Sequence, residues 1–190
     1  MNYFYQKNNN DTLIVLFHGT GGNEYQLLQL MGDVYHNADI LSFEGNFGEG
    51  ISRRFFPPLV NGQLNRERYN EAVQSFMSIW DTLKLQYRHI VLIGYSNGAN
   101  FIIGLLEQGI KVDEAILMHP SNLGYDISNA SSAIRIILTA GANDYIAPAG
   151  QVKQLEQQFA TKFKDVKFIL LDGGHELDEQ EAITIKSYVN

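Results

Sequence analysis

Short apolar runs alternate with amphipathic segments along almost the whole chain. Uninterrupted apolar runs, which a strand buried on both faces requires, occupy residues 12–17, 38–43, 89–93, 114–118, 133–139 and 166–171. Apolar residues at helical spacing predict helices over about 24–31, 66–85, 99–106, 149–163 and 178–188. Residues 2–6 predict a short edge strand. This alternation favours an α/β fold in three layers, with a mostly parallel central sheet and helices on both faces.

The size and composition are those of an ordinary globular chain. With 190 residues, 45% hydrophobic and 18% charged, we expect a single domain over 1–190. The net charge of −7 disfavours nucleic acid and anionic membrane, since both need a basic face. Cysteine is absent, so disulfides, thiolate metal sites and a cysteine nucleophile are excluded. The polar N-terminus does not resemble a signal peptide, so we expect a cytoplasmic protein. The composition is also compatible with a homodimer.

The stretch Gly94-Tyr95-Ser96-Asn97-Gly98 fits the pattern G-x-S-x-G and lies between a predicted strand and a predicted helix. A serine in this position sits on a sharp turn that lifts its hydroxyl clear of the sheet. Small residues are needed two positions to either side, because a Cβ there would collide with neighbouring backbone. The pattern also occurs by chance, but its strand and helix context favours Ser96 as a nucleophile.

A serine hydroxyl needs a base, and the base needs a third group to hold it. Among the five histidines, His175 follows the last strand after two glycines, on a loop flexible enough to turn its ring toward Ser96. His18 and His119 also end strands, but we interpret His18 as shaping the loop that follows it and His119 as structural. His36 and His89 are expected at the surface. We therefore predict His175 as the base.

Two aspartates compete for the third position. Asp144 follows the penultimate strand, so its loop should adjoin the loop of His175. Asp172 ends the last strand directly, but its side chain would have to fold back along the loop of His175. A helix-capping or turn role before Pro148 is the alternative for Asp144. We predict Asp144, which gives the chain order Ser, Asp, His expected for such a turn within a sheet.

Acyl-bond hydrolysis also needs donors for the developing oxyanion, each contributing roughly 3–4 kcal/mol. The amide of Asn97 is one candidate, and the amide of Thr20 is the second, because glycines at 19, 21 and 22 let that loop approach closely. A phosphate cradle is the competing interpretation of this loop. No Lys-Ser/Thr follows the glycines, and neither nucleotide-binding glycine pattern fits.

Together these motifs resemble the α/β-hydrolase superfamily. The stretches that carry the resemblance are 16–24, 94–100, 141–144 and 174–175, and they run through most of the chain. They are similar to the small bacterial carboxylesterase/phospholipase branch, which is related to acyl-protein thioesterases and to hydrolases of hydroquinone- or copper-inducible operons. The resemblance implies an α/β-hydrolase fold. Larger members insert a cap domain where this chain has only residues 121–132, so no cap domain is expected.

The segment Arg53-Arg54-Phe55-Phe56 resembles a substrate loop of the same branch. We predict that one arginine binds an anionic substrate group and that Phe55 and Phe56 help to wall a shallow acyl pocket. An ion pair with Glu44 or Glu49 is the structural alternative for the arginines. Glu44 itself departs from the basic residue expected in relatives.

We therefore expect a serine hydrolase that cleaves small carboxylic esters through an acyl-enzyme on Ser96. A thioesterase or lysophospholipase with the same triad is the alternative among enzymes, and a ligand-binding sensor on a hydrolase scaffold is the alternative outside them. No metal or organic cofactor is implied. Asp172, His175, Glu176 and Asp178 lie close in sequence, but no second histidine completes H-E-x-x-H. The expected partner is a small-molecule ester.

Overall fold

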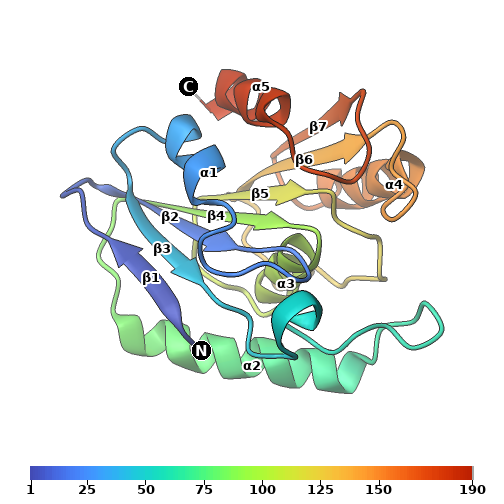
Figure 1. The fold of residues 1–190 in the computed structure, drawn as a ribbon, viewed down its shortest axis with the longest axis horizontal. Coiled ribbons are helices and arrows are strands. Elements are labelled where there is room, and N and C mark those ends of the chain that lie inside the picture. Colours follow the sequence, from blue (N-terminus) through green and yellow to red (C-terminus); the bar gives the residue numbers. More distant parts are fainter. Residues whose placement is uncertain (190) are drawn as a thin grey trace.

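A computed structural model describes residues 1–189 and is built on one seven-stranded sheet (Figure 1). The strands lie in the order β1-β3-β2-β4-β5-β6-β7. Their bounds are β1 Tyr3–Gln6, β2 Thr12–Phe17, β3 Asp39–Phe43, β4 His89–Tyr95, β5 Glu114–Met118, β6 Arg135–Gly141 and β7 Asp165–Leu171. The helices are α1 Leu28–Val34, α2 Arg66–Leu83, α3 Asn97–Glu107, α4 Ala149–Ala160 and α5 Glu179–Val189, with a short 3₁₀ helix, η1 Gly50–Ser52.

The sheet is mostly parallel, as the apolar runs predict. Only β1 pairs antiparallel, with β3, and it lies at the edge with largely exposed side chains. The strands β2, β4, β5 and β6 pair parallel with neighbours on both sides, and their side chains are almost all buried. Burial on both faces explains why these strands read as continuous rather than alternating apolar segments.

Helices cover both faces and form the outer layers (Figure 1). One core contains Phe76 of α2, Phe101 of α3 and Phe159 of α4, packed against one face of the sheet. The other contains Met31 of α1 and Ile185 of α5, packed against the opposite face. The three-layer α/β fold is therefore confirmed, and residues 1–189 include no cap domain. No helix in this range is long and apolar enough to cross a bilayer.

The predicted start of the first helix near Glu24 is wrong, because α1 begins at Leu28. The residues before it form tight turns, in which the amides of Gln26 and Leu28 donate to the carbonyls three residues back, on Asn23 and Tyr25. Oδ1 of Asn23 accepts from the amide of Tyr25, and Oε1 of Gln26 accepts from the amide of Gly19. Such local bonds compete with helix formation.

The carboxyl ends of the parallel strands meet at one edge of the sheet, on the right of Figure 1. Because β4, β5, β6 and β7 are consecutive neighbours, the residues that follow these strands lie side by side. Ser96, His119, Asp144 and His175 all fall in this row. The topology therefore brings together four chemically active residues that are widely separated in the sequence.

Candidate active site

Ser96 occupies a strained turn between β4 and α3. Its φ of 51° lies in the left-handed region, which non-glycine residues rarely adopt. A Cβ at Gly98 would collide with the backbone carbonyls of Phe17 and His18, and one at Gly94 would collide with the backbone of residues 98 and 99. The two glycines thus let the turn pack tightly against the end of β2. The turn has the form that the G-x-S-x-G pattern predicts.

The structure brings Ser96, His175 and Asp144 into one hydrogen-bonded chain. Nε2 of His175 is 2.9 Å from Oγ of Ser96, and Nδ1 of His175 is 2.7 Å from Oδ2 of Asp144. Tyr95 fixes the backbone of His175, because its hydroxyl donates to the backbone carbonyl of that residue at 3.0 Å. The predicted triad residues therefore have the geometry of nucleophile, base and orienting acid.

Asp144 is held as an ionised acceptor. Its side chain is fully buried, and Oδ1 accepts from the amides of Ile146 and Ala147, both at 2.8 Å. Burial alone would raise its pKa, but these amides and the rings of His175 and His119 outweigh burial and lower the pKa. Asp172, the competing aspartate, is exposed, and its described hydrogen bond runs through its backbone carbonyl to Asn143.

A second histidine contacts the same carboxylate. Nδ1 of His119 lies 3.0 Å from Oδ2 of Asp144, and Nε2 of His119 lies 3.2 Å from Oε2 of Glu181 on α5. His119 and Glu181 are each 1% exposed. Burial opposes a charge on His119, but the two carboxylates outweigh burial and raise its pKa. The sequence analysis missed this contact, although a histidine ending the strand between those of Ser96 and Asp144 was a usable signal.

The two backbone amides predicted to form an oxyanion hole have no acceptor within the described protein. Within residues 1–189, neither the amide of Thr20 nor that of Asn97 donates to another protein group. The loop around Thr20 is fixed instead by its neighbours. The amide of Gly21 donates to Arg53, and the amide of Gly22 donates back to Gly19. The side chain of Asn97 accepts from the amide of Phe55 at 2.8 Å and so ties α3 to the 44–62 loop.

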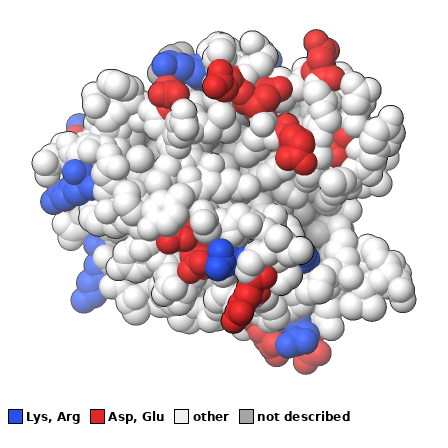
Figure 2. Space-filling view, viewed as in Figure 1, with Lys and Arg blue, Asp and Glu red and all other residues white. Residues whose placement is uncertain are grey.

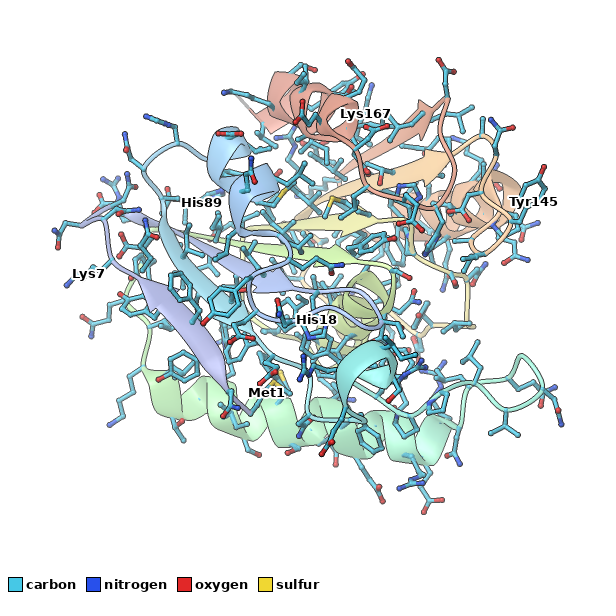
Figure 3. All side chains as sticks on the ribbon, viewed as in Figure 1. Met1, Lys7, His18, His89, Tyr145 and Lys167 are labelled. Atoms are coloured by element: carbon cyan, nitrogen blue, oxygen red, sulfur yellow. The ribbon has the colours of Figure 1, made fainter. Side chains whose placement is uncertain are left out.

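His18 braces the glycine loop from inside the protein (Figure 3). Its Nδ1–H donates to the carbonyl of Gly19 at 2.7 Å, and its Nε2 accepts from the amide of Gly45 at 2.9 Å. Burial lowers its pKa, so the ring is held neutral. This placement fits the predicted loop-shaping role and joins the loop to the start of the 44–62 segment.

The four predicted substrate-loop residues are placed differently from one another. Phe55 and Phe56 are 0% and 3% exposed and belong to the core, where Phe55 stacks on Phe101. Nη2 of Arg53 pairs with Oε1 of Glu44 at 3.1 Å, which is the structural alternative for this arginine. Arg54 donates from Nε to the carbonyl of Ser52. Binding of an anionic substrate group by either arginine stays a prediction.

The edge of the sheet that carries the triad is open. Figure 2 shows the molecule hollowed at the right, the edge toward which the strands of Figure 1 point. Tyr145, next to Asp144, projects into solvent there and is 91% exposed (Figure 3). His89, at the opposite end of β4, lies far from this edge, as expected of a surface residue.

A metal ion would have to compete with the triad itself. His119, Asp144 and His175 place potential ligand atoms within 4.8 Å of one another. Both Nδ1 atoms already donate to Asp144. A metal bound here would displace the hydrogen bonds that orient His175, so the arrangement fits proton transfer better than metal binding.

The chain is similar in sequence to known hydrolases. The family model described as "Dienelactone hydrolase family" matches residues 55–188. The chain belongs to the dienelactone hydrolase family. It is also 29% identical over 189 residues to "Putative hydrolase MhqD" of Bacillus subtilis (strain 168), an alignment that covers 96% of this chain and 94% of that protein.

Solved structures of other hydrolases have the same fold. A Bacillus cereus carboxylesterase is 29% identical, with a TM-score of 0.88 over 99% of this chain and 92% of the other. Zea mays acyl-protein thioesterase 2 is only 15% identical but has a TM-score of 0.77, covering 99% of this chain and 97% of the other, which shows a shared fold. This member of the dienelactone hydrolase family is therefore an esterase-type hydrolase with an α/β-hydrolase fold.

Proposed function

We propose that this protein cleaves small carboxylic esters through an acyl-enzyme on Ser96. The observation that carries the proposal is the continuous hydrogen-bonded chain from Oγ of Ser96 through His175 to the buried carboxylate of Asp144. In this chain Nδ1–H of His175 points at Asp144, which leaves the lone pair of Nε2 facing the serine hydroxyl. That tautomer is the one a general base requires.

The reaction follows from these positions. Oγ of Ser96 attacks the ester carbonyl carbon while Nε2 of His175 takes the hydroxyl proton, and Asp144 stabilises the resulting imidazolium. The amides of Thr20 and Asn97 stabilise the negative charge that develops on the carbonyl oxygen by donating hydrogen bonds to it. His175 then returns its proton to the leaving alcohol. Water repeats the sequence on the acyl-enzyme and releases the carboxylic acid.

A fluorophosphonate probe combined with an ester turnover assay tests the proposal. We expect the probe to label Ser96 covalently, labelling to disappear in Ser96→Ala, and the unmodified protein to turn over p-nitrophenyl acetate. A ligand-binding sensor on this scaffold would label without turnover. The same assay with an ester and a thioester of one acyl group separates an esterase from a thioesterase. The substrate with the higher kcat/KM identifies the preferred bond.

A further inference from the structure

The hydrogen-bonded chain of the active site does not end at Asp144. It continues through the ring of His119 to Glu181, so that five side chains from five segments form one line, Ser96-His175-Asp144-His119-Glu181. The last three members are between 1% and 5% exposed, so none of them is placed to touch a substrate. Serine hydrolysis itself requires only the first three groups. Any effect of His119 and Glu181 on the reaction must therefore be indirect, through their neighbours Asp144 and His175.

The proton count of this line follows from the ionised state of Asp144. Its Oδ1 accepts from two backbone amides and its pKa is lowered, so it is ionised at neutral pH, and each histidine that faces Oδ2 then carries a proton on Nδ1. One further proton lies between Nε2 of His119 and Oε2 of Glu181, which are 3.2 Å apart. With a carboxylate at each end of its ring, His119 is the group best placed to hold that proton.

A charged His119 also acts on the base. The centroids of the His119 and His175 rings are 5.4 Å apart, and Glu181 contacts the far side of the His119 ring. The positive end of the His119–Glu181 pair is thus the end nearer to His175. Asp144 and Tyr95 lie next to both histidine rings. His175 has two further polar neighbours, Ser96 and the adjoining Glu176. Among them His119 is the group that can oppose a positive charge on His175.

We propose that His119 is a positioning residue for the catalytic acid, held as an imidazolium by Glu181. It donates Nδ1–H to Asp144, which fixes the carboxylate opposite His175, and its charge opposes the positive charge that His175 gains when it takes the serine proton. This inference rests on the proposed function. It extends the Ser96 triad by a buried ion pair that links β5 to α5.

The test uses three variants and the pH profile of kcat/KM. His119→Asn removes the charge, and asparagine tolerates the positive φ of 51° that His119 adopts. Because it leaves Glu181 buried without its partner, we expect this variant to be destabilised. His119→Asn combined with Glu181→Gln removes both charges and should recover part of the lost Tm. Glu179→Gln is the matched control, since it removes a carboxylate from the exposed side of the same helix.

Loss of the imidazolium removes a positive charge whose ring centroid lies 5.4 Å from that of His175. We expect the acid limb of kcat/KM to move to higher pH by roughly half to one pH unit in both His119→Asn variants. KM should stay unchanged, because neither residue faces the substrate. Plateau kcat should fall by less than about tenfold, since asparagine can still donate to Asp144. Glu179→Gln should match the parent profile. A role confined to anchoring α5 would lower Tm and leave the acid limb in place, which overturns the inference.

A second measurement does not depend on turnover. Nitrogen-15 NMR of the histidine rings in the Ser96→Ala protein should show one ring protonated on both nitrogens at pH 7, and this signal should vanish in Ser96→Ala combined with His119→Asn. A neutral His119 at pH 7 contradicts the inference. If the parent protein shows no Ser96-dependent turnover, the proposed function fails instead, while the NMR result still decides the charge state of His119.

Discussion

Asp144 connects the reactive serine, through His175, to the buried interior, and its replacement should mainly lower kcat. Ser96→Ala and His175→Ala should each lower kcat by about 10⁴- to 10⁶-fold, and the double variant should be little worse, because the residues act as a unit. Asp144→Asn should lower kcat by roughly 10³- to 10⁴-fold, since an amide no longer fixes the tautomer of His175. Steady-state kinetics on a p-nitrophenyl ester measures all four.

Asp172→Asn is the control for this series. Asp172 is exposed and follows β7 directly, so it tests whether any nearby aspartate can serve. We expect it to retain activity within a few-fold of the parent. An inactive Asp172→Asn together with an active Asp144→Asn would mean that the third member of the triad is misassigned.

His18 and His119 should affect stability with opposite dependence on pH. The folded-state pKa of His18 is lowered by burial, so the unfolded chain takes up its proton first as pH falls below about 6.5. The stability that His18 provides is therefore complete above that pH and is lost toward its folded-state pKa. The pKa of His119 is raised, so its contribution is complete below about pH 6.5 and is lost as pH rises through its folded-state value.

Urea unfolding of the parent, His18→Gln and the His119→Asn, Glu181→Gln double variant between pH 5 and 9 measures these slopes. The stability advantage of the parent over His18→Gln should shrink toward pH 5, by at most about 1.4 kcal/mol per pH unit. Its advantage over the double variant, which leaves no unpaired carboxylate at position 181, should shrink toward pH 9. If both stability differences changed in the same direction with pH, one of the two charge assignments would be wrong.

At the scale of single residues, the sequence predicted the groups that carry out the proposed reaction better than the groups that support them. Ser96, Asp144 and His175 each follow a strand in a recognisable local pattern. Phe55 and Phe56 lie in a loop without periodicity, and such a segment does not reveal which side chains turn inward. The bond between His119 and Asp144 depends on strand order, because β5 lies between β4 and β6. No local pattern encodes that order.

At the scale of elements, the strand, turn and helix that carry Ser96 depend on close backbone approach. The first turn of α3 lies so near the end of β2 that a methyl group on Gly98 would meet the carbonyl oxygens of Phe17 and His18. Gly98→Ala should therefore lower the free energy of unfolding by about 3 kcal/mol and displace the amide of Asn97, with a loss of kcat beyond the loss of stability.

Gly32→Ala provides the comparison within a helix. Gly32 lies in α1, and a methyl group there would meet no atom within 4 Å. Alanine should stabilise this helix by roughly 0.5–1 kcal/mol and leave kcat unchanged. Thermal unfolding and ester turnover of both variants test the pair. Equal changes in Tm and kcat in Gly98→Ala and Gly32→Ala would show that the tight backbone approach at Gly98 is unimportant.

The boundaries of elements were harder to predict than their existence. The first helix was expected near Glu24 but begins at Leu28, because the residues before it form turns with backbone bonds three residues apart and the side chain of Gln26 accepts from the amide of Gly19. The position of the glycine loop that Gln26 contacts follows from the sheet. The parallel strands, in contrast, were predicted closely because burial on both faces leaves a continuous apolar signal.

At the scale of the whole molecule, the open edge of the sheet bears on the size of the substrate. A groove of about 800 Å³ runs between α1 and α5 and is lined by Tyr95, but by none of Ser96, Asp144 and His175. The segment that follows β5, residues 119–134, includes no helix that could form a lid. Phe55 and Phe56, which were expected to wall an acyl pocket, are buried in the core. Among the described residues of the flanking loops, the apolar side chains more than 60% exposed are Ile51, Val60, Tyr145 and Ile146.

An open site with few exposed apolar groups should favour short acyl chains. Each added methylene contributes roughly 0.8 kcal/mol only while it gains contact with protein. For p-nitrophenyl esters from acetate to palmitate, we therefore expect kcat/KM to rise over the first few carbons and then to fall. Without a lid to open at an interface, the rate should show no jump when a substrate passes its solubility limit.

The variant Ile51→Ser tests whether a loop side chain contacts the acyl group. Ile51 is 93% exposed beside the glycine loop, so its replacement should shift the optimum to shorter chains if this contact exists, whereas Ile183→Ser on α5 should not. Peak activity on palmitate, or activation by emulsified ester, would require an extended acyl-binding surface, which is incompatible with this open site.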